Sequence, residues 1–355
     1  MSATARAGHA KWIAITCVVI AGVAISAAQE RPTGQGFSFR TGVELINITA
    51  TVTDQNGRFV PSLRGEDFTV YEDGQPQAVQ QFDSERVPVS LGIALDTSGS
   101  MIGEKMVAAQ AALNRFLFDL LGDQDEVFLY RFDSRPELVQ GWTENRRAVA
   151  RELGTIKPNG GTAIYDTTAA AVQLAQRGTR RKKALVIISD GNDTSSQMRF
   201  DELGPIIRKT EVLVYAIGID ASGEGTNYQP AGPPRPAGPV PVPSPFPGKP
   251  GLPQTPRTPK PSNKPSTPKS NASVDRINVE TLRRITDESG GRTEIIVSPR
   301  DLDPATASVA DELSRQYFLG YSSSAPKDGR WHTIEVRLNR PGTYTVRARR
   351  GFISN

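Results

Sequence analysis

The most informative stretch of the sequence is Leu91-Gly92-Ile93-Ala94-Leu95-Asp96-Thr97-Ser98-Gly99-Ser100. Its first half is apolar and has the length of a buried strand, whereas its second half consists of small residues that include a carboxylate and several hydroxyl groups. In open α/β sheets, ligands bind beyond the carboxyl ends of the strands. We therefore expect a strand at 87–95 with a binding site at its carboxyl end.

Strand and helix patterns alternate along the chain from this stretch onward. Apolar runs predict strands at 126–132, 183–189, 212–219 and 292–297, with a short edge strand at 138–142. Apolar residues at helical spacing predict helices at 101–121, 144–153, 162–177, 199–209, 277–288 and 303–315. Such alternation is typical of a doubly wound, mostly parallel sheet in an α/β domain, which here spans residues 87–315.

Two further loops carry polar residues that belong at the same sheet edge. Asn159-Gly160-Gly161-Thr162 opens a predicted helix, and Ser189-Asp190-Gly191 follows the predicted strand at 183–189. Because parallel strands end at one edge of a sheet, we expect both loops to meet the loop that begins at Asp96. A plain structural interpretation stays open, in which these polar residues only cap helices and form turns.

Together, the three loops resemble the metal ion-dependent adhesion site (MIDAS) of von Willebrand factor type A (VWA) domains, in both order and spacing. The resemblance covers about residues 87–315, apart from a proline-rich insertion. It implies that Ser98 and Ser100 bind a metal ion directly, that Thr162 does so in the ligand-competent state, and that Asp96 and Asp190 act directly or through water.

The chemistry of these side chains agrees with that implication. Hydroxyl and carboxylate oxygens are hard ligands that suit Mg²⁺, Mn²⁺ or Ca²⁺. A carboxylate from a partner can fill an open coordination position on such an ion, because a dication attracts negatively charged ligands. We therefore expect a partner protein that offers an acidic side chain.

The two flanks have strand patterns without helices. Alternating residues and turn signals predict strands at 43–53, 68–72 and 77–82, and again at 317–321, 333–338 and 344–348. Neither flank is large enough to be stable alone, so we expect segments 40–84 and 316–355 to form one β-sandwich around the inserted α/β domain. Segments 52–54, 67–74 and 316–321 also resemble a secreted bacterial subgroup of VWA-related (VWFA-related) proteins.

Residues 221–273 differ from the rest of the chain in composition. This segment is rich in Pro, Gly, Ser, Thr and Lys, and cannot bury a core, so it is predicted to be a disordered insertion within the VWA domain. Its prolines favour extended polyproline II, and its basic residues permit contact with an anionic envelope polymer.

The first 28 residues are typical of an export signal. Arg6 and Lys11 precede the apolar run 12–25, and small residues follow at 26–28. The apolar run is shorter than a membrane-spanning helix requires, so we expect cleavage, no membrane span in the mature chain, and a secreted, periplasmic or cell-envelope location. Retention of the segment as an anchor stays an alternative. Cys17 is the only cysteine and would leave with the signal.

Composition argues against several other functions. The chain has 42 basic and 38 acidic residues, and loss of Arg6 and Lys11 halves the excess, which gives no support to nucleic-acid binding. His332 is predicted to face solvent on a strand, and Asp123 and Asp125 to solubilise a loop. The chain has no phosphate-binding loop and no nucleophile elbow, so we expect a binding protein and not an enzyme.

The sequence thus predicts a secreted, metal-dependent protein for adhesion or assembly. A metal-independent envelope scaffold, acting through the β-sandwich and the basic insertion, is the alternative.

Overall fold

The computed structural model describes residues 44–190, 193–219 and 278–354. Contacts group all of these residues into one unit. The predicted signal at 1–28 and the predicted insertion at 221–273 lie outside the described residues.

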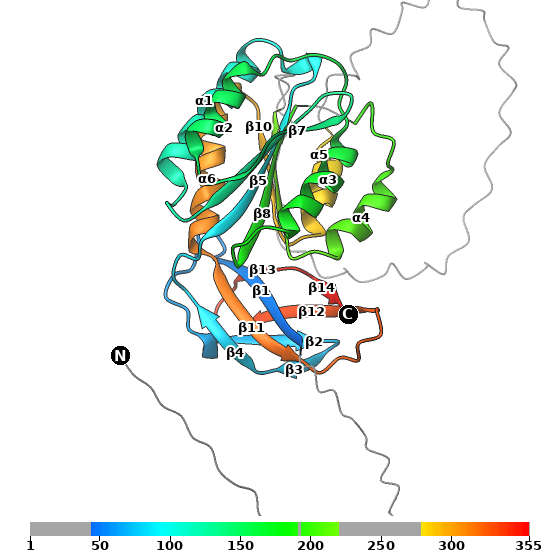
Figure 1. Cartoon of the computed structure of the whole chain (residues 1–355). Helices are drawn as coiled ribbons and strands as arrows, with labels where there is room; N and C mark the ends of the chain where they lie inside the picture. Colours follow the sequence, from blue (N-terminus) through cyan, green and yellow to red (C-terminus); the bar gives the residue numbers. More distant parts are fainter. Residues whose placement is uncertain (1–43, 191–192, 220–277, 355) are drawn as a thin grey trace, which may run out of the picture. The chain divides into compact units, whose positions relative to one another are not determined.

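A six-stranded sheet forms the centre of the α/β part (Figure 1). Its strands are β5 (Val89–Asp96), β6 (Glu126–Phe132), β7 (Pro136–Thr143), β8 (Lys182–Ser189), β9 (Leu213–Ile219) and β10 (Thr293–Ile296). The order is β10-β9-β8-β5-β6-β7, and neighbours are parallel except that β7 is antiparallel to β6. Every residue of β5 is buried, which explains why its apolar run is unbroken.

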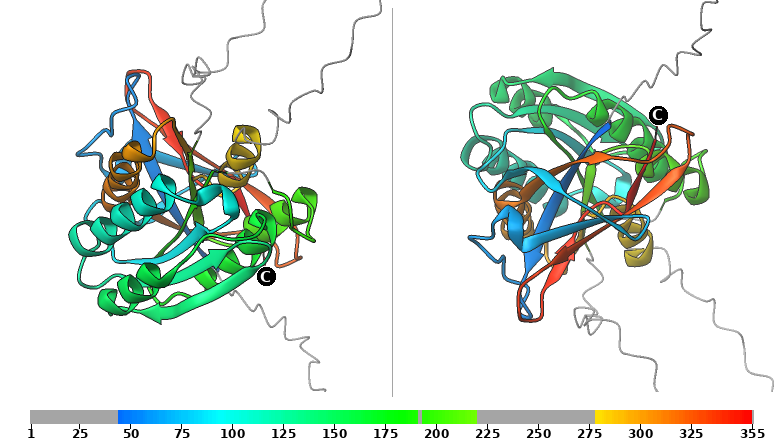
Figure 2. Two further views of the ribbon diagram at one scale, coloured as in Figure 1. Left: turned by 90° about the horizontal axis from the view of Figure 1, so that it is seen from above. Right: turned by 90° about the horizontal axis from the view of Figure 1, so that it is seen from below.

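Helices cover both faces of this sheet (Figures 1 and 2). One face carries α1 (Glu104–Arg115), α2 (Arg146–Thr155) and α6 (Leu302–Arg315), and the other carries α3 (Ile164–Gln176), α4 (Phe200–Arg208) and α5 (Val279–Asp287). Strand β5 contributes Leu91, Ile93 and Leu95 to one core and Ala94 to the other. The doubly wound α/β fold predicted from the sequence is confirmed.

Most element boundaries lie within two residues of the prediction, but the helix predicted at 101–121 is shorter and is not continuous. This segment contains a 3₁₀ turn (η2, Gly99–Met101), then α1, and then a π-helical turn (η3, Phe116–Leu120). Gly103 has a φ of 87°, which separates η2 from α1. The wider π-turn buries Phe116 and Leu117 against the sheet.

The two flanks form a pair of four-stranded sheets. The first has the order β13-β1-β11-β4 and the second β14-β12-β2-β3. Their strands are β1 (Glu44–Thr53), β2 (Phe68–Glu72), β3 (Gln75–Gln77), β4 (Val79–Asp83), β11 (Tyr317–Ser323), β12 (Trp331–Leu338), β13 (Thr345–Arg347) and β14 (Gly351–Ile353). Both sheets combine strands from the two flanks and share one hydrophobic core, so they form a sandwich. A short helix, η1 (Gly65–Asp67), precedes β2.

The flank prediction needed two corrections. The strand predicted at 77–82 corresponds to β4 and includes only the last residue of β3, which was not predicted; β3 pairs with β2 in one sheet and β4 pairs with β11 in the other. Strand β14, which pairs with β12, was not predicted.

Buried polar groups join the sandwich to α6. The carboxylate of Glu312 lies 2.7 Å from Arg292 Nε and 2.8 Å from Arg347 Nη2, and accepts hydrogen bonds from Tyr215 and Thr51. Its side chain is only 9% exposed. Arg292 directly precedes β10, and the other three residues lie in β13, β9 and β1, so a single carboxylate connects the last helix to both parts of the fold.

Two polar residues are more buried than the sequence suggested. Asp125 was predicted to solubilise a loop, but it is buried, pairs with Arg86 and accepts a hydrogen bond from the backbone N–H of Val89. His332 was predicted to face solvent, but it is only 8% exposed and its Nδ1 lies 2.7 Å from Asp73 Oδ2. Both expectations were wrong, because each residue meets an oppositely charged partner that is distant in sequence.

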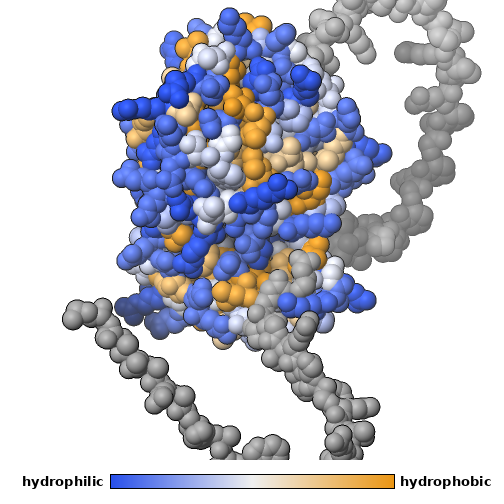
Figure 3. All heavy atoms as spheres, in the orientation of Figure 1, coloured by the Kyte–Doolittle hydropathy of each residue, from blue (hydrophilic) through white to orange (hydrophobic). Residues whose placement is uncertain are grey.

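The surface facing the viewer in Figure 3 is mostly hydrophilic, with hydrophobic residues gathered near its centre and in a lower band. In the part of the chain that the structure describes, no helix combines the length and the apolar character needed to cross a bilayer.

Candidate metal centre

Asp96 is the last residue of β5, and its side chain lies at the carboxyl end of the sheet. The residue has no exposed surface. Its Oδ1 accepts a hydrogen bond of 2.8 Å from the backbone N–H of Ser98, and its Oδ2 accepts one from the hydroxyl of Ser189. Burial raises the pKa of Asp96 to about 6, while the hydrogen bonds from Ser189 and Ser98 act in the opposite direction.

Ser98, Ser100 and Asp190 continue this network. The hydroxyl oxygens of Ser98 and Ser100 are 2.9 Å apart, and the hydroxyl of Ser100 donates a 2.6 Å hydrogen bond to Oδ1 of Asp190. The other oxygen of Asp190 accepts a hydrogen bond from the ammonium of Lys105. The structure therefore brings two of the predicted loops together, as expected from parallel strands that end at one edge.

Thr162 adjoins the network through its loop. The N–H of Asn159 donates to the carbonyl of Thr97 at 2.7 Å, and the N–H of Gly99 donates to the carbonyl of Gly160 at 3.0 Å. Thr162 itself is 4% exposed, and its backbone bonds to Thr194. Within the described residues, no hydrogen bond joins Thr162 to the other four predicted residues.

Three contributors to this site were not predicted from the sequence. Ser189 donates to Asp96, Lys105 donates to Asp190, and Thr194 holds the backbone of Thr162. Ser189 directly precedes Asp190 at the end of a buried strand, so its position gave a usable signal. Lys105 and Thr194 gave none, because their contacts depend on how distant loops approach each other.

The side chains fit a divalent cation by their chemistry. Charged carboxylates without solvent contact cost free energy unless a cation or hydrogen bonds compensate them. Hydroxyl and carboxylate oxygens are the ligands that Mg²⁺ and Mn²⁺ prefer. In the described ranges, no group of three or more His, Cys, Asp or Glu side chains could hold a metal. Any ion here would thus depend on the hydroxyls of Ser98, Ser100 and Thr162, and on water.

Comparison with known families identifies the α/β part. Residues 91–192 match the family described as the von Willebrand factor type A domain, and this range includes all five predicted metal ligands. The chain contains a VWA domain.

Relatives of the VWA domain are distant. The chain is 29% identical over 138 residues to an uncharacterized protein of Synechocystis, a match that covers 38% of this chain and 33% of that protein. It is 30% identical over 153 residues to bovine (Bos taurus) inter-alpha-trypsin inhibitor heavy chain H4, covering 38% of this chain and 17% of that protein. The match thus spans a third or less of each relative.

Among solved structures, the chain is similar to a von Willebrand factor type A protein from Catenulispora acidiphila. The identity is 15% and the TM-score 0.46, with 87% of this chain and 73% of that chain covered. It is also similar to the BatB protein from Bacteroides thetaiotaomicron, with 19% identity, a TM-score of 0.43, and coverage of 64% and 97%.

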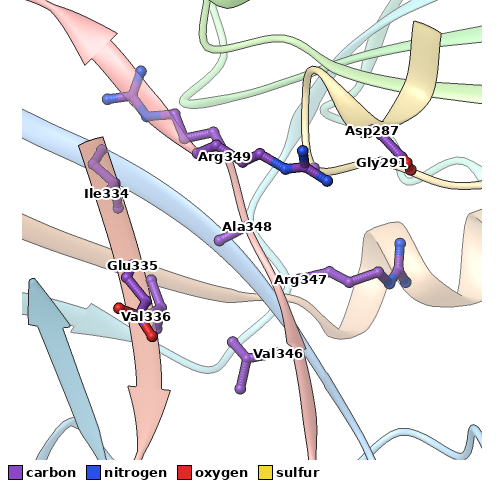
Figure 4. A pocket seen from close by; sticks show the side chains of 11 residues that line it. Asp287, Gly291, Ile334, Glu335, Val336, Val346, Arg347, Ala348 and Arg349 are labelled. Atoms are coloured by element: carbon purple, nitrogen blue, oxygen red, sulfur yellow. The ribbon is translucent and has the colours of Figure 1, made fainter. Parts of the chain in front are cut away.

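A separate pocket lies where the VWA domain meets the sandwich (Figure 4). It has a volume of about 230 Å³ and lies between the turn that precedes β10 and segments 334–336 and 346–350 of the sandwich. Two of its three arginines already have acidic partners, since Arg347 lies 2.8 Å from Glu312 and Arg349 lies 3.6 Å from Glu211. The network at Asp96 is therefore the better candidate for ligand binding.

Proposed function

We propose that this protein binds a divalent metal ion through Asp96, Ser98, Ser100, Thr162 and Asp190, and uses the ion to bind an acidic group of a partner protein. The observation that carries the proposal is the hydrogen-bonded network of two buried carboxylates and two serine hydroxyls at the carboxyl end of the central sheet. Its location agrees with the general position of ligand sites in open α/β sheets.

The metal would supply a Lewis acid with an open coordination position, which a carboxylate of the partner can fill. Neighbouring residues hold the metal-binding side chains in position. Ser189 and the N–H of Ser98 hold Asp96 in place from both oxygens, and Ser100 holds Asp190. Because neighbours already fix these side chains, little rotamer freedom would be lost when the site binds a metal ion.

We further propose that the domain is a binding module in the cell envelope or outside the cell, and not an enzyme. The predicted export signal supports the location. The only histidine beyond that segment, His332, lies in β12 of the sandwich and bonds to Asp73. It is therefore engaged in the sandwich and is not a base beside the network at Asp96.

A metal-independent scaffold is the second candidate, and one observation favours it. Each carboxylate oxygen of Asp96 and Asp190 already accepts a hydrogen bond from the protein. The network is thus satisfied as it stands, which is what a purely structural role requires.

Isothermal titration calorimetry with Mg²⁺ and Mn²⁺ separates these candidates. Wild type should bind one ion, and an Asp96→Ala, Ser98→Ala double variant should not. Asp123→Ala is the matched control, because this aspartate is fully exposed. Circular dichroism must show that each variant is folded. Equal metal affinity in wild type and the double variant would contradict the proposed site.

A pull-down from a cell-envelope extract then tests the function. Recovery of one protein in Mg²⁺, but not in EDTA and not by the double variant, supports metal-dependent binding. Recovery that is the same in all three conditions supports the scaffold.

A further inference from the structure

Lys105 is the second residue of α1 and reaches the predicted metal site from outside the MIDAS pattern. Its ammonium contacts Oδ2 of Asp190, whose side chain is 1% exposed. The Lys105 side chain itself is 20% exposed. The positive φ of Gly103 directs the chain from Ser100 into α1, so Lys105 follows the serine loop closely.

The contact gives the site a counter-charge of its own. Asp96 and Asp190 would carry two negative charges when ionised, and Lys105 supplies one positive charge next to one of them. Charge pairs of this kind make a buried carboxylate tolerable. Asp190 is one of the residues expected to hold the divalent ion, so ammonium and metal need the same carboxylate.

We infer that Lys105 is a tethered counter-cation that competes with the divalent ion for Asp190. It thereby raises the metal concentration at which the site becomes occupied. The inference rests on the proposed function. Like charges separated by a few ångströms repel strongly where solvent is partly excluded. An incoming dication therefore has to displace the ammonium from Asp190 or bind against its repulsion. The lysine stem is long and its end partly exposed, so displacement toward solvent is open to it.

Lys105 has the opposite effect on the partner. With the dication, two carboxylates and the ammonium together, the site retains one net positive charge, whereas a neutral residue at 105 would leave none. The metal-bound site thus attracts an acidic group of the partner more strongly when Lys105 is present. In this way the residue weakens metal binding and strengthens binding of the acidic partner.

Three substitutions separate charge from positioning. Lys105→Met removes both the charge and the hydrogen bond, Lys105→Gln removes the charge but can still donate to Asp190, and Lys105→Arg keeps both. The control is Lys209→Met, because Lys209 is exposed and follows α4 at the amino end of the sheet. The probe is MgCl₂ or MnCl₂ alone, measured by calorimetry, with thermal unfolding in EDTA as the second readout.

We expect Lys105→Met and Lys105→Gln to bind the metal at least about tenfold more tightly than wild type, from the removal of a like charge at close range. Lys105→Arg and Lys209→Met should stay close to wild type. In EDTA, Lys105→Met should melt at a lower temperature than wild type, because Asp190 then lacks its counter-charge. The use of two neutral variants keeps the test valid if one of them does not fold.

The outcomes distinguish this inference from the proposed function. Equal or weaker metal binding by both neutral variants, with normal binding by wild type, would mean that Lys105 only positions Asp190, and the inference would be wrong. Binding by the neutral variants but not by wild type supports the inference and contradicts metal-dependent function in the natural protein. If no variant binds metal, both are wrong.

Discussion

Replacing Glu312 with alanine should destabilise the protein, because this one carboxylate connects α6 to the central sheet and to the sandwich. It contacts Arg292 at 2.7 Å and Arg347 at 2.8 Å, and accepts hydrogen bonds from Tyr215 at 3.0 Å and Thr51 at 3.1 Å. Removal deprives Arg347 of this carboxylate and leaves Arg292 with only its other acidic partner, Glu294, at 3.1 Å.

The expected loss of unfolding free energy is about 3 kcal/mol, near the lower end of the range for breaking a buried ion pair. The lower end applies because the side chains of Arg292 and Arg347 are 28% and 25% exposed and can recover some hydration. Glu312→Gln keeps the shape and some hydrogen bonds, so its loss should be smaller.

The pH dependence of this loss has a defined sign. Burial would raise the pKa of Glu312, but Arg347 and Arg292 outweigh it and hold the pKa below its usual value. A carboxyl group with a lowered folded-state pKa stabilises the protein above the pKa of the unfolded chain, and loses that contribution as pH falls through the folded value. The gap between wild type and Glu312→Gln should therefore narrow in acid.

Urea unfolding followed by circular dichroism at neutral pH measures the effect. Glu335→Ala is the control, since Glu335 is 57% exposed and pairs with Arg337 on the surface, where a pair contributes less than about 1 kcal/mol. If Glu312→Ala costs no more than this control, the network does not hold α6 to the rest of the fold and the reasoning fails.

Two further predictions concern packing and pH. A Cβ on Gly92 would lie 2.3 Å from the ring of Phe128, so Gly92→Ala should lower the unfolding free energy by about 1–3 kcal/mol in the same urea assay. The control is Gly141→Ala, because a Cβ there meets nothing within 4 Å. Equal urea midpoints for the two variants would refute the clash. The hydrogen bond to Asp73 raises the pKa of His332 above its usual value, so its contribution to stability is present below the unfolded-state pKa and is lost as pH rises through the folded value. In the chain without residues 1–28, NMR titration of this single histidine should show the raised pKa, and His332→Gln should flatten the pH profile of the melting temperature; an unshifted titration would contradict this.

The place of the candidate site could be predicted because its physical cause is local. An unbroken apolar run such as 91–95 forms a strand buried on both faces, and the first polar residue after it, Asp96, must then lie at the edge of the sheet. The same reasoning placed Asp190 after β8. These residues needed no knowledge of partners distant in sequence.

The surroundings of the site could not be predicted in this way. Lys105 lies on the first turn of α1, where a lysine is ordinarily a solvated residue, and only the approach of the loop after β8 brings it to Asp190. Asp125 and His332 follow the same rule, since their burial depends on Arg86 and Asp73. The sequence predicted exposure for Asp125 in a loop and for His332 on a strand, and tertiary contacts bury both.

The flank strands show what the sequence pattern cannot predict about β-structure. Residues 77–82 have one continuous strand pattern, yet β3 and β4 join different sheets. Which sheet a short strand joins is decided by long-range pairing, and that information is absent from the alternation of its side chains.

The pairing of β1 with β11 has a consequence for how the chain is made. Glu44 pairs with Ser323, so β1 leaves the ribosome long before its neighbour exists. Domains generally fold as they are synthesised, and long-range strand pairing is slow to close. We therefore expect the VWA domain to fold first.

The folded VWA domain brings the end of β4 and the start of β11 together, where Asp83 pairs with Phe318. It thus acts as a short rigid connection in place of a long flexible loop. Chains that terminate before β11 would leave β1 and β4 as unpaired edges and would be prone to aggregate. The sandwich can thus close only after β11 has been synthesised.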